Sequence, residues 1–175
     1  MNARIDLLRA LIRDVPDFPK PGILFRDITP VLGDGAGFRA AIDAMEELVR
    51  PLNPDVLLPI ESRGFLFAAP LANRLGIGLA PVRKPGKLPG STLKAEYALE
   101  YGSGVLELHV DGLKRGQRVV VIDDLIATGG TAKAAAELAS RAGAEVVSAA
   151  FFIELSFLNG RAALGDVPCH AVLSY

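Results

Sequence analysis

The sequence predicts an α/β fold with a mainly parallel sheet flanked by helices. Apolar runs of strand length, Val56 to Ile60 and Val119 to Ile122, alternate along the chain with stretches such as Thr131 to Ala142, whose apolar residues recur at helical spacing. A strand that is apolar at every position is typical of a sheet covered on both faces, and strands that alternate with helices favour parallel pairing. The chain has 175 residues, of which 50% are hydrophobic, so we expect a single domain over residues 1–175.

The other regular elements are predicted in the same way from the period of the apolar residues. An amphipathic helix opens the chain, because the apolar positions between Ile5 and Ile12 recur at helical spacing. Two further helices and three short strands follow, and Pro70 is expected to disturb the second of these helices. The helices are Phe38 to Val49 and Phe65 to Leu75, and the strands are Leu79 to Val82, Val146 to Ile153 and Ala171 to Leu173.

Two stretches depart from this alternation. Residues Val15 to Gly37 contain four prolines and several glycines. We expect an irregular lid or binding segment there, since a long loop is otherwise uncommon in a compact domain. Lys94 to Tyr101 and Val105 to Val110 alternate polar and apolar residues on either side of Gly102–Gly104, which predicts an antiparallel hairpin.

Composition excludes several classes of protein. The net charge of −1 lacks the excess of positive charge expected of a general nucleic-acid-binding protein. One cysteine, Cys169, and two histidines are too few for an internal disulfide or a zinc site, and they favour a compartment in which thiols stay reduced. Arg4, Arg9 and Arg13 interrupt any signal-peptide core, and no apolar run approaches the roughly 20 residues that span a bilayer. We therefore expect a soluble, cytoplasmic protein without membrane or nucleic-acid partners.

The most informative segment is the strand end and loop from Val119 to Thr131. The apolar strand ends in Asp123 and Asp124, a loop of small residues follows, and a helix begins at once. Glycines let the backbone approach a ligand closely, and the first turn of a helix has unpaired N–H groups. Such a loop beyond the carboxyl end of a strand is suited to a phosphate dianion. We predict that the phosphate is held by Ala127, Thr128, Gly129, Gly130 and Thr131.

Asp123 and Asp124 narrow the choice of ligand. A phosphate repels carboxylates, whereas vicinal ribose hydroxyls donate hydrogen bonds to them. In dinucleotide-binding folds the ribose-binding acid lies about 20 residues beyond the glycine loop. Here the acids directly precede the loop, so phosphate and hydroxyls belong to one small sugar, a 5-phosphoribosyl group. The alternative is a plain strand-to-helix turn in which Asp124 or Thr128 caps the helix.

Several segments resemble those of the type I phosphoribosyltransferases, and the resemblance runs nearly end to end. Val120 to Thr131 is similar to the phosphoribosyl-pyrophosphate motif of that family. The flanking segments, separated and in order, resemble its adenine-using members, namely Pro16 to Pro30, Ser62 to Phe67, Gly86 to Gly90 and Leu99 to Gly102. The resemblance implies transfer of the phosphoribosyl group of phosphoribosyl pyrophosphate to N9 of adenine, with AMP and pyrophosphate as products.

For the base, the resemblance implies that residues 1–35 form an N-terminal helix and a hood over the adenine. Phe25 would stack on the purine, and Leu125 and Ile126 would close the other face. The Leu24 carbonyl would accept from the exocyclic amine, and the Arg26 N–H would donate to ring N1. Hypoxanthine and guanine present donor and acceptor in the opposite order, so these contacts would select adenine. From composition alone, Phe25 would be an ordinary core residue.

For the pyrophosphate, the resemblance implies a role for the loop that follows the apolar run Val56 to Ile60. Ser62 and Arg63 would bind it, since a guanidinium is suited to phosphate oxygens, and this family often has a non-proline cis peptide near Ser62. The alternative is a simple turn capped by an arginine. Glu61 is assigned no chemistry.

A second group of cations lies in a stretch rich in proline and glycine. By resemblance, residues 83–104 form a flexible lid and hairpin, and Arg83, Lys84 and Lys87 close over the pyrophosphate and exclude water. Lys94 is expected to be a solvated surface charge.

The resemblance also supplies catalytic roles. Glu100 would assist proton movement at the imidazole edge of the purine, and Arg63 and Lys87 would stabilise the departing charge. Mg²⁺ would be held by the oxygens of phosphoribosyl pyrophosphate and by water, without a cage of protein side chains. A homodimer is expected.

Other functions remain open at this stage. One is a sister enzyme that uses hypoxanthine, guanine, xanthine or orotate in place of adenine. Another is a ligand-sensing regulator with the same fold, which would need a DNA-binding module, although only about a dozen residues precede the hood. A third is a nucleotide-binding protein without turnover.

Overall fold

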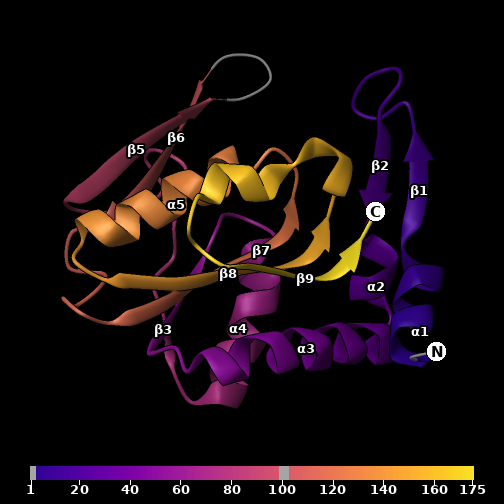
Figure 1. Cartoon of the computed structure of the whole chain (residues 1–175), viewed down its shortest axis with the longest axis horizontal. Coiled ribbons are helices and arrows are strands. Elements are labelled where there is room, and N and C mark those ends of the chain that lie inside the picture. The colour runs from indigo at the N-terminus through magenta and orange to yellow at the C-terminus, as the bar shows by residue number, and fades with distance from the viewer. Residues whose placement is uncertain (1–2, 99–102) are drawn as a thin grey trace. The chain divides into compact units, whose positions relative to one another are not determined.

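The computed structural model describes residues 3–98 and 103–175, and the chain divides into two compact units, Met1–Ala44 and Met45–Tyr175. The sheet of the larger unit consists of β3 (Val56–Pro59), β4 (Gly78–Leu79), β7 (Arg118–Ile126), β8 (Glu145–Glu154) and β9 (Cys169–Ser174). All neighbours pair in parallel, in the order β4-β3-β7-β8-β9 (Figure 1). The predicted α/β class is confirmed.

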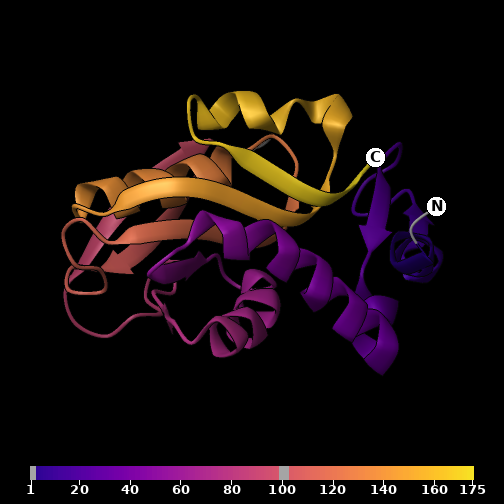
Figure 2. The same cartoon turned by 60° about the horizontal axis from the view of Figure 1, so that its bottom comes forward.

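Helices cover both faces of this sheet, as Figures 1 and 2 show from two directions. α4 (Gly64–Leu75) lies on one face and α5 (Gly130–Arg141) on the other. On β8, Phe152 stacks on Phe67 of α4 with ring centroids 5.2 Å apart. Its neighbour Phe151 belongs to the cluster that includes α5 residues, because successive strand residues point to opposite faces. The apolar run on β8 therefore serves both layers, as expected for a covered parallel sheet.

An antiparallel hairpin is present, as predicted, and consists of β5 (Thr92–Ala98) and β6 (Ser103–His109), which pack against α5. Ser103 and Gly104 had been predicted in the turn but belong to β6. The register of the hairpin places Lys94 opposite Glu107. The predicted extension of the first strand to Tyr101 lies outside the described residues. Short 3₁₀ helices complete the unit: η1 (Arg50–Leu52), η2 (Ser156–Leu158) and η3 (Gly160–Leu164).

The strand predicted over Leu79 to Val82 is only partly regular. β4 ends at Leu79, yet backbone pairing with β3 continues through Ala80 N–H to Leu57 O and Val82 N–H to Pro59 O, both at 2.9 Å. Pro81 lies between these two donors on the edge strand, where its missing N–H removes none of the bonds to β3.

The smaller unit contains more regular structure than its sequence suggested. Its elements are α1 (Ala3–Leu11), β1 (Arg13–Pro16), β2 (Leu24–Asp27), α2 (Thr29–Gly33) and the first part of α3 (Gly35–Val49). β1 and β2 form an antiparallel hairpin, in whose turn the Asp17 carboxylate accepts the Gly22 N–H at 2.7 Å. The prediction of an irregular stretch from Val15 to Gly37 is therefore wrong. None of the hairpin strand residues is buried, so no apolar alternation marks them.

None of the helices in the described ranges combines the length and the apolar character that a membrane crossing requires.

Asp27 at the end of β2 offers a test of the smaller unit. Hydrogen bonds from the side chain and backbone of Thr29 and from Arg13 lower the pKa of Asp27 from 3.8 to about 2. Because the folded-state pKa lies below the ordinary value, the carboxylate stabilises the fold fully above about pH 3.8 and loses this effect as the pH falls through about 2. Asp27→Asn should lower the free energy of unfolding by about 1 kcal/mol at pH 7.

Urea unfolding of both proteins at pH 7 and near pH 2 checks this expectation. The difference between them should shrink at the lower pH, and a difference of the same size at both would contradict the role of the carboxylate charge.

Candidate active site

The candidate site lies where the order of the strands reverses. β3 and β7 are neighbours, but the chain leaves β3 towards β4 on one side and leaves β7 towards β8 on the other. The loops that follow them diverge, and such a switch point is where ligands bind in open α/β sheets. A cavity of about 320 Å³ lies there, with residues of both loops in its wall. It is lined by Glu61, Ser62, Arg63, Lys84, Tyr97, Asp123, Asp124, Leu125, Ile126, Ala127, Thr128, Gly129, Thr131, Ala132 and Phe151.

The two acids predicted to bind a diol lie within β7, which continues beyond them to the buried Ile126, and they have different partners. Asp124 is buried, and its Oδ2 accepts a hydrogen bond from Arg63 Nε at 2.5 Å. Asp123 Oδ1 accepts the N–H of Asp124 at 2.9 Å. Burial, followed by the charge of Asp124, raises the pKa of Asp123 well above its ordinary value. Arg63 therefore pairs directly with Asp124 and acts on Asp123 through its charge alone, which only partly offsets the raised pKa of Asp123.

Arg63 is the side chain that compensates Asp124. Burial alone would lower the pKa of Arg63, but the charge of Asp124 and the hydrogen bond between them outweigh it, and the pKa is raised. Arg63 had been predicted at the pyrophosphate. A guanidinium has five N–H donors, so one bond to Asp124 is compatible with that role.

The loop Ala127–Thr131, called the phosphate loop below, leads from β7 into α5. Gly129 is the N-cap of α5 with φ 81°, and no side chain caps this helix end. The alternative in which Asp124 or Thr128 caps the helix is therefore wrong. Of the predicted loop residues, all line the cavity except Gly130, which begins the helix. The N–H groups of a first helical turn have no intrahelical partner, so this loop offers backbone donors to an anion.

Gly160 supports the phosphate loop from behind, and sequence reasoning missed it. A Cβ on Gly129 would meet the Gly160 carbonyl, and a Cβ on Gly160 would meet the Ala127 carbonyl, both far inside contact distance. The two backbones thus touch without side chains between them. A close approach across a sequence separation of this kind leaves no local signal beyond the glycines themselves.

The loop after β3 brings Ser62 and Arg63 to the cavity, as predicted. The peptide bond between Glu61 and Ser62 is cis. Glu61, to which no chemistry had been assigned, accepts from Arg83 Nε at 3.1 Å and from Lys84 N–H at 2.9 Å. Burial alone would raise the pKa of Glu61, but these bonds lower it. Glu61 therefore ties the β3 loop to the predicted lid.

Of the three cations predicted to close over the pyrophosphate, only Lys84 lines the cavity. Arg83 donates to Glu61 and, at 3.2 Å, to the Lys87 carbonyl, so its guanidinium organises the loop itself. Lys87 is exposed and is not part of the wall. In the described structure the predicted trio is therefore not gathered on one ligand.

Buried Glu107 on β6 anchors the same loop from the other side. It accepts from the Gly86 N–H at 3.2 Å and from Lys94 Nζ at 3.0 Å, and the hydrogen bond from Lys94 is the main reason that the pKa of Glu107 is lowered. Lys94 is thus exposed but ion-paired, where a purely solvated charge had been expected.

The remaining predicted residues fall outside this cavity or outside the described chain. Glu100 lies outside the described residues. Leu24, Phe25 and Arg26 belong to the smaller unit, where Phe25 packs edge-to-face on Phe18 with centroids 5.1 Å apart. Leu24 is exposed, and Arg26 pairs with Asp14. A small cavity of about 270 Å³ in this unit is lined by Val15, Phe18, Phe25 and Asp27.

Tyr97 and Phe151 line the main cavity and were not predicted to do so. Phe151 reads as one residue of a buried strand, which gives no sign that its ring reaches the site. Tyr97 belongs to the first strand of the predicted hairpin, and the sequence could have pointed to it because a tyrosine hydroxyl needs a partner when buried.

A parallel sheet with a cavity at its switch point is typical of α/β enzymes, and comparisons with known proteins give the family. Residues 31–163 match the phosphoribosyl transferase domain family. Adenine phosphoribosyltransferases of Synechococcus and of Anaeromyxobacter dehalogenans are 58% and 56% identical, covering 96% and 98% of this chain and 98% and 99% of the relatives. The crystal structure of the Rhodothermus marinus enzyme superposes with a TM-score of 0.93 at 49% identity and covers 100% of both chains.

A further solved structure is more distant in sequence but equally close in fold. The Saccharomyces cerevisiae adenine phosphoribosyltransferase, complexed with an imino-altritol bisphosphate and adenine, has a TM-score of 0.92 at 40% identity over 98% of this chain and 99% of its own. This chain belongs to the phosphoribosyltransferase family and, within it, to the adenine phosphoribosyltransferases.

The contact between Gly129 and Gly160 can be tested separately from backbone strain. Gly129→Ala and Gly116→Ala both place a side chain at a positive φ, 81° and 78°, but nothing lies within 4 Å of a Cβ on Gly116. Each substitution should cost about 1–2 kcal/mol of strain. Only Gly129→Ala should lose a further 1–3 kcal/mol or so to overpacking against Gly160.

Guanidinium unfolding of the two variants measures the difference. Equal losses would show that the phosphate loop yields freely and that Gly160 does not constrain it.

Proposed function

We propose that this chain transfers the 5-phosphoribosyl group of phosphoribosyl pyrophosphate to N9 of adenine and releases AMP and pyrophosphate, a reaction of purine salvage. The observation that carries the proposal is a backbone anion site and two carboxylates at the end of one strand. An anion site alone fits many phosphorylated ligands, whereas hydrogen-bond acceptors beside it select a diol. The relative from yeast was solved with adenine and a bisphosphate of a sugar-like ring, which are ligands of the same chemical kind.

The sugar is held twice in this proposal. The N–H groups of the phosphate loop and the hydroxyls of Thr128 and Thr131 bind the 5-phosphate, where the dipole of α5 favours negative charge. Asp123 and Asp124 accept from the ribose hydroxyls. Donors at the carboxylates stabilise their charged form, so binding should offset the raised pKa of Asp123.

The pyrophosphate lies towards the β3 loop in this proposal. Ser62 and Arg63 line that side of the cavity, and the guanidinium can donate to phosphate oxygens while its Nε stays on Asp124. Lys84 adds a cation from the lid. Arg83 and Lys87 contribute when the lid closes, a role that the resemblance implies.

For the base, we propose the contacts that the resemblance implies for Leu24, Phe25 and Arg26 and for Leu125. Leu125 lines the cavity beside the buried Ile126. N9 attacks the anomeric carbon as the bond to pyrophosphate breaks, and Glu100 assists the proton that leaves the imidazole edge. Arg63 and Lys87 stabilise the negative charge that develops on the leaving group.

Mg²⁺ is proposed as a companion of phosphoribosyl pyrophosphate. No cluster of three or more ligating side chains occurs within residues 3–98 and 103–175, and this donor set fits a metal that keeps substrate oxygens and water as ligands. Asp123 and Asp124 are the carboxylates that would lie beside such an ion, because they bind the ribose hydroxyls in this proposal. When bound, Mg²⁺ neutralises charge on the pyrophosphate.

Two properties of the whole protein are also proposed. The resemblance implies a homodimer, which sedimentation analysis can test. A cytoplasmic location fits the single cysteine, Cys169, since disulfides are rare in reducing compartments.

The direct test is release of pyrophosphate from phosphoribosyl pyrophosphate, with and without adenine and Mg²⁺. Release should require all three components. Asp123→Asn with Asp124→Asn should lower kcat/KM by at least about 100-fold, since two charged acceptors of the ribose are lost. Asp166→Asn, at an exposed position away from the cavity, is the matched control and should retain full activity.

Ribose 5-phosphate binding to the wild-type protein without pyrophosphate release would identify a ligand-sensing protein instead of an enzyme.

Base specificity has a separate test. Adenine should be preferred over hypoxanthine and guanine by about 10⁴-fold in kcat/KM, because the wrong bases leave polar groups at the base site unpaired. Parallel assays with each base and phosphoribosyl pyrophosphate measure this. Comparable turnover of hypoxanthine would show that Leu24 and Arg26 do not select adenine through hydrogen bonds to the exocyclic amine and ring N1.

A further inference from the structure

An ion pair beyond the cavity wall joins the end of β8 to η3. Glu154 is buried, and its two carboxylate oxygens accept from Arg161 Nε at 2.5 Å and from Arg161 Nη2 at 2.6 Å. Ser174 Oγ of β9 donates to the same carboxylate at 3.2 Å, and Arg161 also donates to the Cys169 carbonyl. Two parallel bonds from a guanidinium fix orientation as well as distance. η3 is therefore held rigidly against the ends of two strands.

This pair lies one residue from the backbone that supports the phosphate loop. Arg161 directly follows Gly160, whose backbone touches Ala127 and Gly129 without intervening side chains. A second link lies beside it, since the Leu155 N–H, next to Glu154, donates to the Ile126 carbonyl at 3.0 Å. Any displacement of η3 is thus transmitted to the loop through backbone atoms, which cannot rotate away as a side chain can.

The pKa shifts of Glu154 and Arg161 both favour the charged form of each side chain, as expected for a persistent ion pair. The hydrogen bond from Arg161 is the main reason that the pKa of Glu154 is lowered, and Glu154 in turn raises the pKa of Arg161. Neither side chain lines the cavity, so neither touches a substrate bound there.

We propose that the Glu154–Arg161 ion pair is a positioning element for the phosphate loop, acting through the backbone of Gly160. It sets where the loop N–H groups stand, and so it determines affinity for the 5-phosphate and not for the base. The inference rests on the proposed function, because it assigns the loop to the 5-phosphate of phosphoribosyl pyrophosphate.

The experiment measures ribose 5-phosphate binding by calorimetry, together with KM for each substrate and the melting temperature. Glu154→Gln removes the charge, and Arg161→Lys keeps the charge but loses the two-pronged geometry. In both, Kd for ribose 5-phosphate and KM for phosphoribosyl pyrophosphate should rise about tenfold, as expected when binding groups shift by a fraction of an ångström. KM for adenine should stay within about twofold. Gly160→Ala should give the same signature by pressing directly on Ala127.

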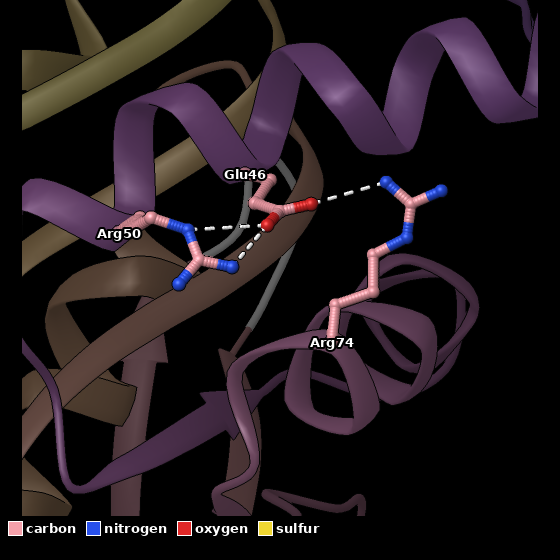
Figure 3. Close-up of polar contacts among 3 residues, drawn as sticks. All are labelled: Glu46, Arg50 and Arg74. Carbon is pink, nitrogen blue, oxygen red and sulfur yellow. Dashed lines mark hydrogen bonds and ion pairs between the residues drawn. The ribbon is translucent and has the colours of Figure 1, made fainter.

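Glu46→Gln is the matched control. Glu46 on α3 accepts from Arg50 Nε at 3.2 Å and from Arg74 Nη1 of α4 at 3.1 Å (Figure 3). It is also a partly buried carboxylate that joins two elements through arginine, but none of its partners lines the cavity. Its loss should lower the melting temperature and leave both KM values unchanged.

The outcomes separate the alternatives. A lower melting temperature with unchanged Kd and KM in Arg161→Lys and Glu154→Gln would show that the pair only stabilises the fold, and the inference would be overturned. If Glu154→Gln does not fold, the values of Kd and KM for Arg161→Lys and Gly160→Ala test the inference in its place. Absence of ribose 5-phosphate binding by the wild-type protein would instead overturn the proposed function and the inference with it.

Discussion

Two carboxylates on consecutive residues at the end of a buried strand are the constraint around which the site is arranged. Asp124 is buried and ionised side chains are costly to bury unless paired. Arg63 supplies that pairing from the neighbouring loop, and the reversal of strand order brings the two loops together. The charge of Asp124 contributes to the raised pKa of Asp123, and the charge of Arg63 acts against it. The diol site therefore depends on the β3 loop as much as on β7.

The anion site is built differently, from backbone packed on backbone. Gly129 turns the chain into α5, and Gly160 comes so close behind it that neither position has room for a Cβ. Gly64 makes a similar close backbone contact at the start of α4, where a Cβ would lie 2.7 Å from the Ile122 carbonyl. These three close approaches, of Gly129 to Gly160, of Gly160 to Ala127 and of Gly64 to Ile122, set the spacing of the loops that enclose the cavity. Each is a contact with backbone atoms, so a change of side-chain rotamer cannot relieve it.

The sequence predicted those parts that depend on local pattern. The run Val119 to Ile122 is apolar throughout, and the acids and glycines that follow mark the site within a dozen residues. The smaller unit's hairpin was missed because none of its strand residues is fully buried, so no apolar alternation marks them. The pairings of Arg63 with Asp124 and of Arg83 with Glu61 could not be read from sequence, since which opposite charges meet depends on the fold. The partnership of Lys94 and Glu107 could not be read either, because a turn at Gly102–Gly104 would give a different register from the observed one.

These pairings explain why backbone groups and not cations are the better donors for the 5-phosphate. A cationic side chain beside carboxylates pairs with them, as Arg63 and Arg83 both do in the described structure. A backbone N–H cannot leave its place to neutralise a neighbouring acid, so the phosphate loop keeps its donors aimed at the cavity beside Asp123 and Asp124. A site that must hold an anion and a diol side by side therefore separates the two tasks chemically. In the proposed function, fixed dipoles of the helix end bind the phosphate and the acids bind the hydroxyls, while the arginines balance the acids until a more negative ligand binds.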